Sequence, residues 1–90
     1  DAIEHIVVEE SAKCLVLRMR AVPALDSTAM NALTALTKTC ESKGVTIVFS
    51  HVNEQPMKVM KKAGFVALAG EENFCPNITA ALERAEEIIK

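Results

Sequence analysis

Short apolar runs alternate along this chain with segments of helical periodicity, and this order constrains the fold more than any other feature. The runs at residues 14–19 and 45–49 are nearly continuously apolar, as in strands that are covered on both faces. A shorter run at 65–69 predicts a third strand nearer the edge of the sheet. Strands that alternate with helices are usually joined by crossovers and lie parallel. The sequence therefore predicts an α/β fold: a small, mostly parallel sheet with helices packed on it.

The helical segments carry their own start and stop signals. The first begins after Asp26, a favoured N-cap type, and stops at Gly44, where a left-handed residue can close the last turn. The second is predicted over 53–63, with Met57 and Met60 facing inward. The third opens at Asn77 and carries one apolar stripe: Ile78, Ala81, Leu82, Ala85 and Ile89.

The front of the chain is ambiguous. Ile3, Ile6 and Val7 have helical spacing, and we predict a helix there, although a short strand fits the same residues. The chain has 90 residues and no internal repeat, low-complexity tract or linker-like stretch. We therefore expect a single domain over residues 1–90.

Composition excludes several function classes. The net charge of −2, from 10 basic and 12 acidic residues, provides no field suited to a phosphate backbone, so we expect no nucleic-acid partner. Cys14, Cys40 and Cys75 have no CxxC spacing, which favours buried, reduced thiols in the cytosol over a disulfide or a metal site. The isolated glycines form no phosphate-binding loop. No stretch approaches the ~18 apolar residues of a membrane span. We expect a soluble polypeptide without a cofactor.

The strongest local feature is the stretch 22–28, which joins a predicted strand to a predicted helix and ends in Asp26-Ser27-Thr28. The first amides of a helix are unpaired and the helix dipole is positive there, so a phosphorylated Ser27 or Thr28 would be stabilised electrostatically. The alternative is structural: Asp26 caps the helix and the hydroxyls bond locally. The residues alone favour capping.

Two other groups of polar residues are weaker candidates. Ser50 and His51 end the second strand, but neighbours in sequence need not converge in space, so we expect a loop there, with Asn53 or Glu54 starting the next helix, and no catalytic site. Lys58, Lys61 and Lys62 form a basic cluster. A solvated face explains the cluster, and contact with an acidic partner or anionic lipid is the alternative.

The sequence Leu-Arg-Met-Arg-Ala-Val-Pro-Ala-Leu-Asp-Ser-Thr at residues 17–28 resembles the STAS domain, in the form found in SulP (sulfate permease-like) anion transporters. Stretches 44–48, 63–65, 70–73 and 80–85 follow in the order of that branch, so the resemblance covers nearly the whole chain. It implies a non-enzymatic regulatory domain on the cytoplasmic side of the membrane, attached to the membrane domain of the same transporter and open to a regulatory protein partner.

The resemblance also implies roles for individual residues. In the related anti-sigma-factor antagonists the third position of the motif is the phosphoacceptor, which corresponds to Thr28, with Ser27 beside it. The glycine that commonly follows the motif is Ala29 here, which suits a helix better by about 1 kcal/mol but leaves less room for a partner. The alternative function is a stand-alone phospho-switch of the antagonist kind.

Family members begin with a β-hairpin before their first helix, and we expect this chain to start inside that helix, without the hairpin. Three strands alone make a poor core. The exposed edge of such a sheet should then favour dimerisation or aggregation.

Overall fold

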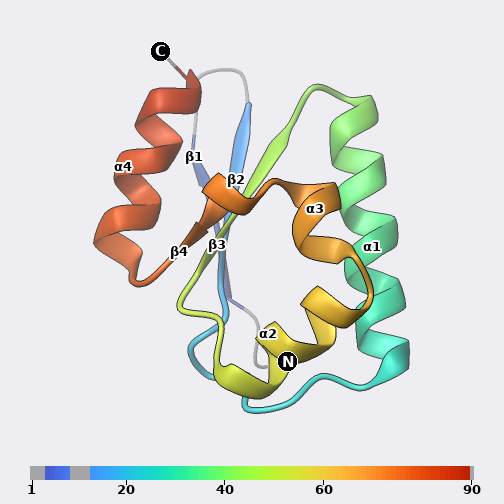
Figure 1. Ribbon diagram of the computed structural model, residues 1–90. Coiled ribbons are helices and arrows are strands. Elements are labelled where there is room, and N and C mark those ends of the chain that lie inside the picture. Colours follow the sequence, from blue (N-terminus) through green and yellow to red (C-terminus); the bar gives the residue numbers. More distant parts are fainter. Residues whose placement is uncertain (1–3, 9–12, 90) are drawn as a thin grey trace.

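The computed structural model describes residues 4–8 and 13–89, and they form an α/β domain around a four-stranded sheet of order β1-β2-β3-β4 (Figure 1). The strands are β1 (Glu4–Val8), β2 (Cys14–Arg18), β3 (Thr46–Ser50) and β4 (Phe74–Cys75). β2, β3 and β4 are parallel, and β1 runs antiparallel to β2. The predicted fold class is confirmed, with one antiparallel strand on the edge of a parallel sheet.

Helices cover both faces of the sheet (Figure 1). α1 (Ser27–Ser42), α2 (Glu54–Lys62) and α3 (Phe65–Ala69) lie on one face, and α4 (Ile78–Ile89) lies on the other. A 3₁₀ turn, η1 (Glu71–Asn73), joins α3 to β4. Strands covered in this way are apolar on both faces, which explains the continuous apolar runs of β2 and β3. Among the described residues, no helix is both long and apolar enough to cross a membrane.

Two apolar clusters hold the layers together. The larger one packs β2 and β3 against α1, α2 and α3, with Phe49 and Met60 fully buried within it. The smaller one packs the opposite side chains, such as Val16 and Val48, against Ala81 and Ala85 of α4. The small α4 residues bring that helix close to the sheet. Met60 faces the core as predicted, whereas Met57 is half-buried.

The segment 65–69 was predicted as a strand and is the short helix α3, so that prediction is wrong. Phe65 is buried and its ring meets that of Phe49 edge to face, with 5.5 Å between ring centroids. The side-chain amide of Asn73 donates to the carbonyl of Ala69 at 2.8 Å, and Arg84 Nε donates to Asn73 Oδ1 at 2.9 Å. The carbonyl at the helix end thus gains a partner that a short apolar run cannot reveal.

The helix predicted at the front is also wrong, because residues 4–8 form β1. In the sheet, Ile6 pairs with Val16 and Val7 with Leu15. Ile3, which the predicted helix included, lies outside the described residues. β1 and β2 supply an antiparallel pair at the front of the chain, so the sheet has four strands and not the three expected. The two-residue strand β4 was not predicted.

Candidate functional site

Asp26 lies at the N-cap position of α1, with an extended backbone (φ −98°, ψ 177°). Its Oδ1 atom accepts a hydrogen bond from the backbone N–H of Ala29 at 2.8 Å. This bond satisfies one of the unpaired amides of the first turn. Ser27 and Thr28 follow as the first residues of the helix, and both are exposed. The structure therefore presents two hydroxyls to solvent at the positive end of a 16-residue helix.

Two amide side chains hold the loop that precedes α1: Asn53, at the N-cap of α2, and Gln55, within α2. Asn53 Nδ2 donates to the carbonyl oxygens of Arg20 at 3.0 Å and Val22 at 2.8 Å. Gln55 Oε1 accepts from the N–H of Leu25 at 2.8 Å, and Gln55 Nε2 donates to the Leu25 carbonyl at 3.3 Å. These bonds span about thirty residues of sequence, and sequence analysis missed them because neither amide belongs to a recognisable motif.

An open groove of about 340 Å³ lies beside the exposed hydroxyls, between α1 and α2. Its lining combines apolar side chains with Ser27 and one cation, Lys62. The complete set is Leu25, Ser27, Met30, Asn31, Val59, Lys62 and Ala63. The loop 22–28 and the basic cluster of α2, which sequence analysis treated separately, therefore meet at one surface. We call this surface the α1/α2 groove.

The rest of the basic cluster faces solvent. Lys58, Lys61 and Lys62 are all exposed, and only Lys62 lines the groove. A solvated helix face therefore accounts for Lys58 and Lys61, whereas Lys62 adds a positive charge beside Ser27.

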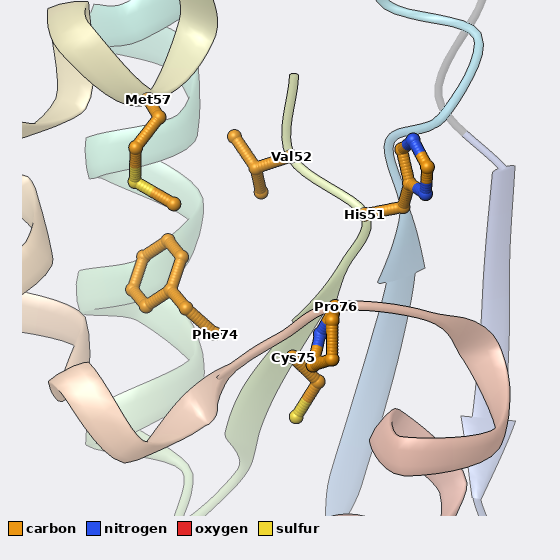
Figure 2. A pocket seen from close by; sticks show the side chains of 6 residues that line it. All are labelled: His51, Val52, Met57, Phe74, Cys75 and Pro76. Atoms are coloured by element: carbon orange, nitrogen blue, oxygen red, sulfur yellow. The ribbon is translucent and has the colours of Figure 1, made fainter. Parts of the chain in front are cut away.

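In the described part of the chain, no hydrogen bond joins the side chains of Ser50 and His51. Ser50 is only 2% exposed, whereas His51 is exposed and has a left-handed backbone with φ of 55°. Figure 2 shows the imidazole of His51 turned away from Met57 and Phe74, which line the opposite side of a cavity of about 330 Å³. Asn53 takes the N-cap position of α2, in agreement with the loop prediction, but its side chain makes no cap bond there.

The three cysteines are free thiols. Burial raises the pKa of the Cys14 thiol above its usual value of 9.0, and the charge of Arg84 opposes part of this rise. Burial likewise raises the pKa of the Cys75 thiol; the charge of Arg84 lowers this pKa and the charge of Glu87 raises it. A raised pKa keeps a thiol protonated and weakly nucleophilic at neutral pH. Cys14 and Cys75 therefore have the character of structural residues.

Comparison with known proteins places this geometry in a family. Residues 1–81 match the model of the STAS domain. A sulfate transporter family protein from Wolinella succinogenes is 35% identical, with a TM-score of 0.83 over 92% of this chain and 68% of the other. The STAS domain of a SulP transporter from Vibrio cholerae is 30% identical, with a TM-score of 0.80 over 89% of this chain and 62% of the other.

The search of curated proteins found no match. The chain spans about two thirds of the length of the two solved structures. With the family model covering 81 of the 90 residues, the chain belongs to the STAS-domain family and is similar to the STAS domains of SulP transporters.

Proposed function

We propose that this STAS domain is the cytoplasmic regulatory and interaction domain of a bacterial SulP-type permease for sulfate or a related anion. The observation that carries the proposal is its similarity to solved domains of a sulfate transporter family protein and of a SulP transporter, at 35% and 30% identity. On this proposal its first partner is the membrane domain of the same protein, and it acts without catalysing a reaction.

The α1/α2 groove supports a role in binding a protein partner. It is lined mainly by apolar side chains, and apolar burial is the main driving force of protein association. Lys62 and Ser27 at its edge provide the polar contacts that fix a partner's orientation. The hydrogen bonds of Asn53 and Gln55 hold Leu25 and its neighbours in position before a partner binds.

Ser27, which lines the groove, and its exposed neighbour Thr28 are the candidate phosphoacceptors. A phosphoryl group on either exposed hydroxyl would add about −1.5 to −2 charge beside the groove and near the positive end of α1. Ala29, which replaces the glycine of the family motif, is half-buried and packs against the larger core cluster. The side chain of Ala29 thus favours the helix. Phosphorylation of Thr28 would act on the surface that the domain presents to a partner.

The stand-alone phospho-switch has no specific observation in its favour, since the solved relatives named above are transporter domains. The proposed absence of enzymatic activity is supported by the same similarity to transporter proteins.

The decisive experiment measures anion uptake by the full-length protein in proteoliposomes and co-purification of its membrane and STAS domains expressed separately. Ala63→Glu places a charge in the groove, and Ala67→Glu places the same charge on an exposed position of α3 outside it. We expect only Ala63→Glu to weaken co-purification and alter uptake. Thr28→Glu should alter one of the two readouts, and Thr39→Glu, the same change at an exposed position near the end of α1, is its control. Equal behaviour of Ala63→Glu and Ala67→Glu, or a full-length protein that moves no anion, contradicts the proposal.

A further inference from the structure

A further cavity, of about 280 Å³, lies where β2 and β3 end and α4 begins. Its lining is cationic and polar with one apolar residue: Arg18, Arg20, Ser50, His51, Asn77 and Ile78. None of these six residues is acidic. The carboxyl ends of parallel strands are where α/β domains generally bind ligands. Neither the family match nor the proposed function assigns a role to this cavity, which we call the strand-end cavity.

Ser50 is the buried polar group of the strand-end cavity. Its residue is only 2% exposed and lines the cavity. A ligand in the cavity would meet this hydroxyl in the wall, and a hydroxyl can both donate and accept a hydrogen bond.

The remaining wall supplies donors. Arg20 makes no ion pair within the described part of the chain, and its guanidinium is suited to paired hydrogen bonds with an oxyanion. Arg18 is engaged in another interaction, and its positive charge adds to the field of the cavity. The imidazole of His51 lies on the same side as these arginines. Its left-handed backbone is fixed by a hydrogen bond from its N–H to the Cys75 carbonyl, at 2.9 Å.

The start of α4 completes the wall. Asn77 Oδ1 accepts from the N–H of Ala80 at 2.8 Å, and the carbonyl of Asn77 accepts from Ala81. This leaves the backbone N–H groups of Ile78 and Thr79 as the first-turn donors of a 12-residue helix whose first turn holds no acidic residue. Such a helix start attracts anions.

We propose that the strand-end cavity binds a small oxyanion, with Arg20, Ser50, His51 and the first amides of α4 as its donors. The class comprises tetrahedral and planar anions such as sulfate, phosphate and carboxylates, because each of these four groups can donate a hydrogen bond. The volume of 280 Å³ is just below the usual range of about 300–1,000 Å³ for pockets that hold drug-sized ligands. The cavity therefore suits a small anion better than a nucleotide. This inference is independent of the proposed function.

The test is a titration of the ¹⁵N-labelled 90-residue chain with sodium sulfate, followed by NMR at constant ionic strength set with sodium chloride. We expect saturable shifts of the His51, Ile78 and Thr79 amides. Arg20→Gln should raise the Kd about tenfold, as for the loss of a charged hydrogen bond, and Ser50→Ala about threefold. Lys38→Gln removes the same charge from an exposed position of α1 and should leave the Kd within about twofold.

His51→Gly provides a second variant, because glycine accepts the left-handed backbone without strain, and it should also weaken binding. Parallel titrations with inorganic phosphate and glycerol phosphate distinguish a free anion from an anionic group on a larger molecule, and saturation by either supports the site. Shifts that do not saturate with any of the three probes overturn the proposal. Equal weakening by Arg20→Gln and Lys38→Gln also overturns it, because it would show a general effect of surface charge.

Discussion

Asp26 makes a contribution to stability that is separate from any role of its neighbours. The substitution Asp26→Ala removes the acceptor of the Ala29 N–H and should lower the free energy of unfolding by about 0.5–2 kcal/mol. Asp26→Asn keeps a side-chain oxygen and should cost much less. Thr28→Ala, at an exposed position, should also cost less than Asp26→Ala. Urea unfolding of the three variants measures these differences, and an Asn variant as unstable as the Ala variant would contradict the capping role.

Cys14 links stability to alkaline pH. Its thiol is fully buried and has a raised pKa, so the folded chain retains this proton to higher pH than the unfolded chain does. The contribution is fully present below the usual thiol pKa of 9.0 and is lost as pH rises through the folded-state value. We therefore expect the free energy of unfolding to fall as the pH is raised above about 9.

Alkylation by iodoacetamide checks the same property directly. At pH 8 the Cys14 thiol of the folded chain should react far more slowly than after unfolding in urea, because it is both buried and protonated. Peptide mass spectrometry identifies the modified cysteine. Equal rates in the folded and unfolded chain would show that Cys14 is accessible and would remove the basis of the pH prediction.

At the scale of the elements, the start of α2 fixes the loop before α1. Asn53→Ala removes the donor to the Arg20 and Val22 carbonyls and leaves the part-buried Val22 oxygen without it. We expect a loss of about 1–3 kcal/mol in the free energy of unfolding, the usual cost of an unsatisfied buried polar group. Glu54→Ala, at the adjacent exposed position, is the control and should cost less. A loss for Asn53→Ala no larger than that of the control would show that the loop keeps its position by packing alone.

The elements that sequence analysis predicted correctly are those with long, regular patterns. α1 and α4 have several turns of apolar periodicity, and β2 and β3 are continuous apolar runs between clear turn signals. The segment 65–69 is too short for either period to be visible, and its helix depends on contacts with Phe49 and Asn73. The spacing of Ile6 and Val7 fits both a helix and a strand. Pairing with β2 is what makes the segment a strand. β4 has two residues and no pattern at all.

The candidate site, too, could be predicted from the sequence only in part. Asp26, Ser27 and Thr28 were identified because a cap residue and two hydroxyls stand together in sequence. The hydrogen bonds that Asn53 and Gln55 make to the loop before α1 depend on α2 packing beside α1. The same packing brings Ser27 and Lys62 to one groove. The strand-end cavity likewise joins residues from β2, β3 and α4. Sequence patterns describe residues that are neighbours along the chain. These surfaces instead join residues that are distant in sequence and are brought together when the chain crosses from one strand or helix to the next.

At the scale of the whole molecule, the fold makes one edge of the sheet a candidate for self-association. β1 pairs with β2 on one side and, within the part of the chain that the structure describes, it is the last strand of the sheet on that side. An edge strand presents backbone N–H and C=O groups that another strand can pair with. β4, at the opposite edge, has only two residues and offers a much shorter template. We therefore expect the 90-residue chain to form dimers through β1 as its concentration rises.

Sedimentation equilibrium over a wide range of concentration should show a monomer–dimer equilibrium, and hydrogen exchange should show protection of β1 amides that increases with concentration. His5→Lys places a charge on the edge strand and should weaken the dimer, because charged residues on edge strands oppose pairing. Thr39→Lys adds the same charge at an exposed position of α1 and should leave the equilibrium unchanged. A well-protected monomer at every concentration, or equal effects of the two lysine variants, would exclude pairing through β1, since only that edge distinguishes the two substitutions.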